Sequence, residues 1–389
     1  MRALVLDSTR CTAIVSDVPI SDLAAGEILV RVHAIALNPV DALYTFDPLA
    51  SASPDSNPPR ILGSDFAGVV ERCGHSDRSN AHLKVGDRVA GFLQGASSVN
   101  HRPGAFAEYV AVPSDLIWRI PDSMTFEEAA SVSLCGLTAA QALFGSNRLG
   151  LTAPWIKETD VHRGEGQTQP LGAARTLFIY GASTSVSLYA AQLAHHAKED
   201  IKLIGAASPR HFEWLQNQPY TYDHLVDYRT DWQWTVSQLT DGEGLDLAYD
   251  CISEGHTVES ISKLMKPHGQ MAVVRSIQGG AWAQTAELPI EPSYGAVWEG
   301  LGDEVQYKGM NLPANPEAKA FAVNFYQWLS KGGERLKPNV VRMMPGGLEK
   351  VVEDGFQLLG SGLMTDRKQD RNESWMQPVS AEKLVYRLV

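Results

Sequence analysis

The most constraining feature of this sequence is a buried strand that runs through a tight turn into an apolar helix, at residues 176–187. The segment reads Thr-Leu-Phe-Ile-Tyr-Gly-Ala-Ser-Thr-Ser-Val-Ser. At such a junction the free backbone N–H groups and the helix dipole both favour an anion. In open α/β sheets this is where the pyrophosphate of a dinucleotide lies. The segment therefore predicts a dinucleotide site whose turn begins at Gly181.

The glycine fingerprint of such sites is incomplete in this chain. The full pattern is G-x-G-x-x-G, and here Ser183 and Val186 stand at the second and third glycine positions. Ser183 still offers a hydroxyl and a backbone N–H to phosphate. Val186 keeps the helix farther from the strand. A strand–helix turn without any ligand is the alternative interpretation of this segment.

The next predicted strand ends without an acidic residue, in Ala-Ala-Ser-Pro-Arg at 206–210. An Asp or Glu there would bind the 2′-hydroxyl of a ribose and repel a 2′-phosphate, whereas Ser208 and Arg210 suit a 2′-phosphate. The cofactor predicted from these residues is NADPH, and hydride transfer is the chemistry that it supplies.

The length and net charge of the chain limit its number of domains and its classes of partner. The 389 residues are enough for two domains, and the net charge of −12 argues against nucleic acid and anionic membranes as partners. No apolar run reaches about 20 residues, and the N-terminus is charged too early for a signal peptide. The four cysteines stand singly, which argues against a disulfide framework or a cysteine-rich zinc lobe. We expect a cytoplasmic enzyme.

The hydrophobic patterns predict an α/β protein with two kinds of domain. Residues 1–140 are β-rich and broken by turns, and Thr125 with Glu128 forms a capping box that opens a helix. From residue 176 to 274 strands and helices alternate, which predicts a doubly wound parallel sheet. The last residues return to the first pattern. Expected strands are 27–33, 66–71, 88–92, 105–110, 177–180, 201–206, 225–227, 245–250, 270–274, 340–344 and 383–388; expected helices are 136–144, 187–197, 256–266, 316–331 and 348–359.

These patterns predict that the nucleotide-binding domain is inserted into the first domain. The first domain comprises residues 1–174, with a long polar loop at 145–174, and resumes at 313–389. The nucleotide-binding domain comprises residues 175–312.

Several short motifs, in this order and spacing, resemble those of the medium-chain dehydrogenase/reductase superfamily over essentially the full length. They are Asn-Pro-Val-Asp at 38–41, Leu-Gly-Ser-Asp-Phe-Ala-Gly-Val-Val at 62–70, Lys-Val-Gly-Asp-Arg-Val at 84–89, Gly-Ala-Phe-Ala-Glu-Tyr-Val at 104–110, Cys-Gly-Leu-Thr-Ala-Ala at 135–140, and Glu-Lys-Leu-Val at 382–385. The resemblance implies a GroES-like β-rich catalytic domain joined to a Rossmann domain.

Within that superfamily the chain resembles the zinc-independent, quinone-reductase-like branch. The zinc-dependent branch carries a ligand Cys where this chain has Asn-Pro-Val-Asp at 38–41, and Gly-His-Glu where it has Gly-Ser-Asp at 63–65. The turn Tyr-Gly-Ala-Ser-Thr-Ser is most similar to that of the fungal trans-acting enoyl reductases, which serve polyketide synthases and polyketide–peptide hybrid synthases. No metal is expected.

The likeness implies that NADPH delivers a hydride to the β-carbon of an α,β-unsaturated polyketide thioester on an acyl carrier protein. Charge then develops on the thioester oxygen, which hydroxyl or backbone N–H donors must stabilise. Thr138, Asn38 and Tyr44 are the expected catalytic residues, although Thr138 also fits a helix-satisfying threonine and Tyr44 a wall aromatic. The expected cofactor-binding residues are Pro39, Asp41, Thr138, Gly181, Ala182, Ser183, Thr184, Ser185, Ser208, Arg210, His211, Tyr228 and Cys251.

Two other functions share these residues. One is a stand-alone NADPH quinone or alkenal reductase acting on small molecules. The other, which the two missing glycines motivate, is a cofactor-degenerate partner of a synthase or a non-redox isomerase. We expect a monomer, because Pro289 and Pro292 interrupt the segment that would extend the edge of the cofactor sheet.

Overall fold

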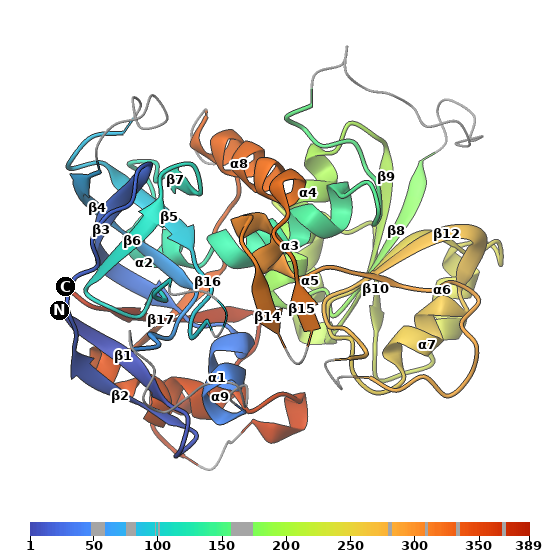
Figure 1. Ribbon diagram of the computed structural model, residues 1–389. Helices are drawn as coiled ribbons and strands as arrows, with labels where there is room; N and C mark the ends of the chain where they lie inside the picture. The colour runs from blue at the N-terminus through green and yellow to red at the C-terminus, as the bar shows by residue number, and fades with distance from the viewer. Residues whose placement is uncertain are drawn as a thin grey trace. The chain divides into compact units, whose positions relative to one another are not determined.

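The computed structural model describes residues 1–47, 59–74, 83–97, 99, 102–156, 174–278, 282–307, 310–331, 335–367 and 371–389 (Figure 1). The chain forms two compact units. The first unit comprises Met1–Leu134 and Val297–Val389, and the second unit comprises Cys135–Ala296.

The units divide earlier in the chain than the boundaries expected after residues 174 and 312, for two packing reasons. Residues 135–156 pack within the second unit, where Phe144 meets Trp155 edge to face and the Thr152 N–H donates to Glu199 at 2.8 Å. Residues 297–301 form a 3₁₀ turn that packs against helix α8 (Pro316–Ser330) of the first unit. Residues 157–173, most of the expected loop, lie outside the described ranges.

The second unit is built on a six-stranded, all-parallel sheet in the order β10-β9-β8-β11-β12-β13. This order places β8 and β11 side by side at the point where the direction of winding reverses, and it confirms the predicted doubly wound sheet. The strands are β8 (Arg175–Tyr180), β9 (Ile201–Ala207), β10 (His224–Asp227), β11 (Leu245–Asp250), β12 (Met265–Val273) and β13 (Ser293–Tyr294); the helices are α4 (Ser185–His196), α5 (Phe212–Gln216), α6 (Trp232–Leu239) and α7 (Thr257–Ser262).

The first unit holds a mainly antiparallel sheet in the order β16-β17-β3-β4-β5-β7, with β6 pairing β3 as well. Gly68 of the Gly-Ser-Asp-Phe-Ala-Gly motif lies where a Cβ would come within 2.0 Å of the Arg31 carbonyl oxygen, so only glycine fits there. The strands of that sheet are β3 (Glu27–Ala36), β4 (Asp65–Cys73), β5 (Arg88–Phe92), β6 (Tyr109–Pro113), β7 (Ile117–Arg119), β16 (Val340–Met344) and β17 (Glu382–Arg387). Two separate two-stranded sheets pair β1 (Arg2–Asp7) with β2 (Thr12–Asp17) and β14 (Val305–Tyr307) with β15 (Met310–Leu312).

Three helices carry residues of the predicted motifs. Helix α1 (Pro39–Phe46) follows β3, and α2 (Phe126–Ala130) opens with the predicted capping box, in which the Thr125 hydroxyl accepts from the Glu128 N–H and the Glu128 carboxylate accepts from the Thr125 N–H. Helix α3 (Ser133–Phe144) begins in the first unit and continues into the second.

The helix predicted at 348–359 is instead a succession of 3₁₀, π and α turns that ends in α9 (Gln357–Leu359). The Tyr386 hydroxyl donates to the Lys350 carbonyl at 3.0 Å and so competes for an acceptor of a regular helix. Gly355 also lets the backbone approach Leu37, whose Cδ1 would lie 2.3 Å from an added Cβ.

Several other predicted elements differ at their ends, and for two of them a contact gives the reason. The helix expected at 256–266 ends at Ser262, because the Leu264 carbonyl accepts from the Leu245 N–H and the next residue already belongs to β12. The strand expected at 105–110 begins only at Tyr109, because residues 106–108 bond to β1 instead: the Leu4 N–H donates to the Phe106 carbonyl and the Glu108 N–H to the Arg2 carbonyl.

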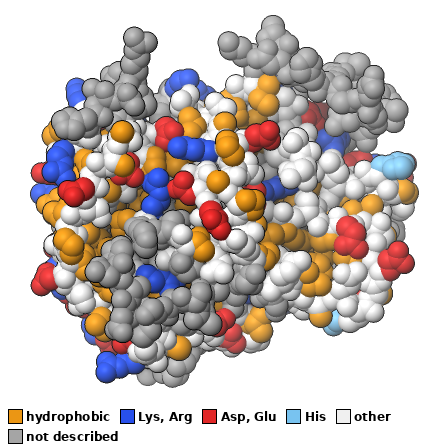
Figure 2. All heavy atoms as spheres, viewed as in Figure 1, with side chains coloured by type: hydrophobic (Ala, Val, Ile, Leu, Met, Phe, Trp, Pro, Cys, Tyr) orange, Lys and Arg blue, Asp and Glu red, His pale blue; other side chains and the backbone are white. Residues whose placement is uncertain are grey.

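Acidic, basic and apolar side chains are interspersed on the face drawn in Figure 2. None of the helices in the described ranges has the length and apolarity needed to span a bilayer.

Candidate functional site

The turn after β8 has the geometry that a pyrophosphate site requires. Gly181 adopts φ +77°, a conformation that L side chains rarely accept, and a Cβ there would lie 2.7 Å from Ile252 Cγ1. The Ala182 N–H donates to the Ala206 carbonyl at 2.8 Å, which ties the turn to the end of β9. A larger residue at position 181 would therefore be strained by the positive φ and would clash with Ile252.

A hydroxyl network fixes the N-terminus of α4 on this turn. Thr184 is the N-cap, and its hydroxyl accepts from the Ser187 N–H at 3.3 Å. The buried Ser187 Oγ lies 2.8 Å from the carbonyl oxygens of both Gly181 and Thr184. Ser187 was not among the predicted site residues, and a serine three residues after the N-cap is not the Glu or Gln of a capping box that would have marked it. Ser183 and Ser185 lie half-buried on the same turn.

The strand beside β8 brings Cys251 to this turn. The Cys251 N–H donates to the Tyr180 carbonyl at 3.0 Å, and its side chain interacts with the Thr184 hydroxyl. Burial, reinforced by Asp250, raises the pKa of the Cys251 thiol well above its usual value. Cys251 is therefore a neutral, packed thiol next to the turn rather than a reactive thiolate.

The residues predicted for the 2′-phosphate follow β9 directly. Ser208 precedes a 3₁₀ turn formed by Pro209–His211, on which Arg210 is exposed. The Arg210 Nε lies 3.2 Å from His211 Nε2, and burial, followed by the charge of Arg210, lowers the pKa of His211. A neutral imidazole that bonds to the guanidinium orients Arg210 without adding a second charge.

Tyr228 follows β10 and is 45% exposed. The neighbouring Arg229 guanidinium lies 5.8 Å from its ring centroid and forms two hydrogen bonds of 2.9 Å with the Asp227 carboxylate. Tyr228, one of the predicted cofactor-binding residues, is therefore partly open to solvent while the Arg229 guanidinium lies over its ring.

The residues of the second unit fit a bound dinucleotide. The first N–H groups of α4 lack intrahelical acceptors, as at every helix start, and they surround a turn in which a Cβ has no room. A hydroxyl and a guanidinium stand at the end of the adjacent strand. The pyrophosphate contact of the turn at 181–185 and the 2′-phosphate contact of Ser208 and Arg210 stay predictions.

A second cluster, wholly inside the first unit, contains the predicted residues Asn38 and Asp41. The Asp41 carboxylate accepts from the Asn38 N–H at 2.8 Å and from the Ser64 hydroxyl at 2.7 Å. Asn38 Nδ2 donates to Asp65 Oδ2 at 2.9 Å, and Asn38 Oδ1 accepts from the Lys383 ammonium. We call Asn38, Asp41, Ser64, Asp65 and Lys383 the buried polar cluster.

Every member of the buried polar cluster is at most 3% exposed. Burial raises the pKa of Asp41 to about 7, against the opposing hydrogen bonds from Ser64 and Asn38. The Asp41 side chain bonds to the Asn38 N–H and to Ser64, and the Asn38 side chain bonds to Asp65 and Lys383, all inside the first unit. A catalytic contact of Asn38 and a cofactor contact of Asp41 stay predictions.

The buried polar cluster does not fit a metal ion. Its oxygens come from Asn38, Ser64 and two carboxylates, and the Lys383 ammonium already lies against the Asn38 and Asp65 oxygens that face it. A divalent cation there would meet a fixed positive charge. In the same described ranges, no three His, Cys, Asp or Glu side chains come together as a metal ion would need.

The remaining predicted residues lie on three helical positions. Pro39 is the exposed first residue of α1, and Thr138 is half-buried on α3. Tyr44 is 4% exposed; its hydroxyl accepts from Gln94 Nε2 at 3.0 Å and donates to the Gln306 carbonyl at 3.4 Å. Its ring meets Trp298 edge to face. This packing fits the wall-aromatic alternative for Tyr44.

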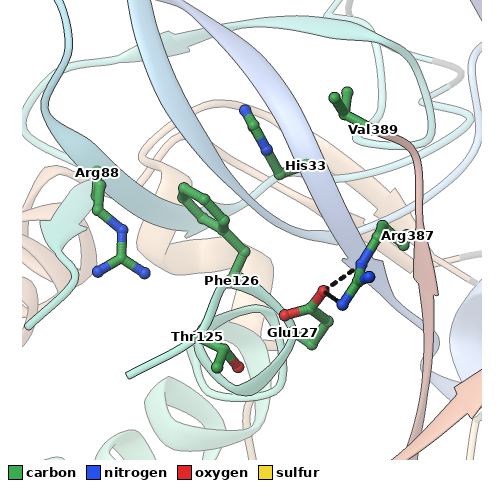
Figure 3. Close-up of a pocket in the computed structure, with 7 residues that line it drawn as sticks. All are labelled: His33, Arg88, Thr125, Phe126, Glu127, Arg387 and Val389. Atoms are coloured by element: carbon green, nitrogen blue, oxygen red, sulfur yellow. Dashed lines mark hydrogen bonds and ion pairs between the residues drawn. The ribbon is translucent and has the colours of Figure 1, made fainter. Parts of the chain in front are cut away.

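A cavity of about 370 Å³ opens on the first unit between β3, β5, α2 and β17 (Figure 3). His33 stacks on Phe126 at 4.5 Å, the Arg88 guanidinium lies 4.6 Å from the same ring, and Glu127 pairs with Arg387. None of the residues that line it is a predicted site residue. Its side chains mainly hold α2 against the sheet.

Two protein-family models match this chain, one within each unit. Residues 24–122 match the family model described as "Alcohol dehydrogenase GroES-like domain", and residues 185–292 match "Zinc-binding dehydrogenase". The trans-enoyl reductase ACTTS2 of Alternaria alternata is 31% identical over 94% of this chain and 97% of its own length. The trans-enoyl reductase caaB of Aspergillus niger is 30% identical over 99% and 96%.

The chain belongs to the medium-chain dehydrogenase/reductase superfamily. It is an oxidoreductase with the GroES-like and Rossmann parts that the sequence resemblance implied. The second family model bears a zinc-binding name, but the buried polar cluster offers no place for that metal in this member.

Solved structures agree on this medium-chain dehydrogenase/reductase fold. The CurK enoyl reductase superposes with a TM-score of 0.68 at 17% identity, covering 99% of this chain and 98% of its own. A mycobacterial protein complexed with NADPH superposes with a TM-score of 0.65 at 20% identity, covering both chains completely.

The Gly181 geometry predicts that Gly181→Ala weakens NADPH binding at least tenfold in dissociation constant, because the added methyl displaces Ile252 and the turn with it. Fluorescence titration with NADPH measures this. Gly242→Ala is the matched control, since Gly242 has φ +76° with open space around it, so it bears the same backbone cost of roughly 1–2 kcal/mol without the clash. Equal affinities for both variants would contradict the assignment.

The raised pKa of Asp41 predicts a pH dependence of stability. Because the folded-state pKa is about 7 and the ordinary value is 3.8, the folded state holds a proton that the unfolded state releases. This group's contribution to the free energy of unfolding therefore falls as pH rises from about 4 to 7. Urea unfolding at pH 5 and 7.5 should show a smaller pH difference in Asp41→Asn than in the wild type.

Asp246→Asn is the control for that measurement. Side-chain and backbone hydrogen bonds from Lys266 and Thr176 outweigh burial and lower the pKa of Asp246, so its stabilising contribution is lost only below pH 4. This variant should keep the wild-type difference between pH 5 and 7.5. A wild-type difference retained in Asp41→Asn would refute the assignment to Asp41.

Proposed function

We propose that this chain is a trans-acting enoyl reductase that uses NADPH to reduce α,β-unsaturated polyketide thioesters carried on the acyl carrier protein of a synthase. The observation that carries the proposal is the combination of the Gly181 turn with Ser208 and Arg210 at the end of β9, in a chain alignable over nearly its whole length with trans-enoyl reductases.

The reaction places clear demands on the protein. When bound, NADPH supplies the hydride that bonds to the β-carbon; the carbon–carbon double bond becomes single, and the α-carbon takes a proton. Negative charge develops on the thioester oxygen in the transition state, so the site needs hydrogen-bond donors there and no nucleophile. Water supplies the α-carbon proton in this proposal.

The chain's own residues would meet these demands as follows. The N–H groups and hydroxyls at 181–185 hold the pyrophosphate, while Ser208 and Arg210 select the 2′-phosphate over a free 2′-hydroxyl. The Thr138 hydroxyl, half-buried on α3, donates to the thioester or to the cofactor. Tyr44, whose hydroxyl is engaged with Gln94 and Gln306, serves as a wall rather than as the proton donor.

The partner follows from the substrate. A thioester on a carrier protein must enter the site on its phosphopantetheine arm, so the reductase needs an open approach to its site. The short edge strand β13 follows Pro292 directly, which suits a monomer because so short an edge offers little pairing to a second copy.

The test is oxidation of NADPH at 340 nm with pantetheine- and carrier-linked α,β-unsaturated thioesters, beside quinones and free enones. Turnover selective for the thioesters is the expected result. Turnover of quinones or enones alone would instead identify a small-molecule reductase. No oxidation together with no NADPH binding would leave the partner or isomerase alternative.

The cofactor assignment predicts that Arg210→Ala raises the KM for NADPH on the order of 10- to 100-fold, because a hydrogen-bonded charge pair is lost. The KM for NADH should stay within about twofold, since NADH has no 2′-phosphate. Arg10→Ala removes the same charge from an exposed position of the first unit and should change neither constant. A parallel loss for both cofactors in Arg210→Ala would contradict a 2′-phosphate contact.

A further inference from the structure

The buried polar cluster contains a lysine to which the proposed reaction gives no role. Lys383 lies on β17, and its side chain is 3% exposed. Its ammonium donates to Asn38 Oδ1 and lies 3.4 Å from Asp65 Oδ2. A buried ion pair of this kind is weak evidence for stability, because desolvation of the two charges offsets most of their attraction. Stability alone therefore does not explain why a lysine is buried beside Asp65.

Asp65 connects this lysine to the start of α3. While Oδ2 faces Asn38 and Lys383, Oδ1 accepts from the Leu134 N–H at 2.8 Å. Leu134 is the second residue of α3, and the first N–H groups of a helix have no partner within the helix. A carboxylate at this end also interacts favourably with the helix dipole. Asp65, distant in sequence, thus caps α3.

Other contacts hold the same turn. The Ser133 hydroxyl accepts from Trp118 Nε1 at 2.9 Å, and the Ser133 carbonyl accepts from the Tyr326 hydroxyl at 3.2 Å. The Trp118 and Tyr326 donors are neutral. Of the three side chains that bond to this turn, Asp65 is therefore the one whose hydrogen bond depends on its charge. Thr138 lies four residues after Leu134, just over one turn along the same helix.

We propose that Lys383 is a positioning residue of the reduction: its ammonium holds the Asp65 carboxylate against the first turn of α3, and this turn fixes the rotation and depth of the helix that carries Thr138. The inference rests on the proposed function, because it assumes that Thr138 contacts the reacting molecules. Lys383 itself touches neither substrate nor cofactor in this proposal.

The charge of Lys383 matters because Asp65 is fully buried. Burial raises the pKa of Asp65, and Lys383 is the strongest of the groups that oppose this rise. The titratable groups that face Asp65 are Lys383 from β17, Asp41 from α1 and Tyr326 from α8. Of these only Lys383 is a cation. Without it, Asp65 would take up a proton more readily and would cap the helix less strongly.

The test compares Lys383→Met, which keeps the length of the side chain and removes its charge, with the wild type. We expect kcat for the thioester to fall on the order of 10- to 100-fold, as small misplacements of a reacting contact do, while the NADPH dissociation constant stays within about twofold. The activity of the variant should recover as pH rises, because Asp65 then loses its proton. Amide hydrogen exchange in peptides covering 131–144 should become faster.

Two further variants separate positioning from stability. Lys266→Met removes a lysine that pairs with Asp246 at 2.9 Å in the second unit and should leave kcat and the exchange of α3 unchanged. The double variant Lys383→Met/Asp65→Asn removes both buried charges, and the side-chain amide oxygen that it introduces can still accept from the Leu134 N–H. On a logarithmic scale, the double variant should regain at least a third of the decrease in kcat that Lys383→Met causes.

The outcomes distinguish the inference from the proposed function. If Lys383→Met lowers only the melting temperature, with kcat, pH profile and α3 exchange as in the wild type, the positioning role is refuted. If the wild type reduces no thioester yet Lys383→Met still accelerates exchange in α3, the proposed function fails and the capping by Asp65 and Lys383 stands. A double variant as slow as the single variant would refute the coupling of the two charges.

Discussion

The geometry of the second unit depends on one backbone constraint, the positive φ of Gly181. The chain must leave the central strand β8 and enter α4 within a few residues, and the space that a side chain would need is filled by Ile252. Ile252 follows β11, the neighbour of β8 on the other side of the point where the winding reverses. The turn, the helix start and the buried thiol of Cys251 therefore meet because the strand order places them at one edge.

This constraint also explains how the chain tolerates an incomplete glycine fingerprint. The first glycine supplies the conformation, which no other residue can supply cheaply. Ser183 and Val186 stand at the two later positions, and hydrogen bonds of the Thr184 and Ser187 hydroxyls hold the turn to the start of α4. The missing glycines that motivated a cofactor-degenerate alternative are thus compatible with an intact helix start.

Elements that depend on residues close together in the sequence were predictable, and contacts between residues distant in the sequence were not. Strands β11 and β16 begin and end where the alternation of apolar residues placed them, and the Thr125 capping box formed as expected. Periodicity does not reveal that the Tyr386 hydroxyl takes the Lys350 carbonyl, so the segment 348–359 was predicted as a regular helix. In the candidate site, motifs identified Asn38 and Asp41, but only the fold shows that side chains distant in sequence share one buried cluster with them. A motif marks a position without saying which way its side chain points.

Each unit places a fully buried carboxylate behind a functional segment, and the two are stabilised differently. Asp250 accepts from the N–H groups of Ile252 and Ser253 and from the Thr257 hydroxyl, all neutral donors, and shapes the turn that closes over Gly181. Burial raises its pKa, as it does for Asp65, and the described groups that oppose this rise are neutral hydrogen-bond donors. Two or three short hydrogen bonds suffice to hold a carboxylate that shapes its own loop. Asp65 must instead reach another helix, and it shares the interior with Asp41, whose pKa the charge of Asp65 raises. In the first unit the Lys383 ammonium opposes the rise in the pKa of Asp65, whereas neutral hydrogen-bond donors oppose it at Asp250 in the second unit.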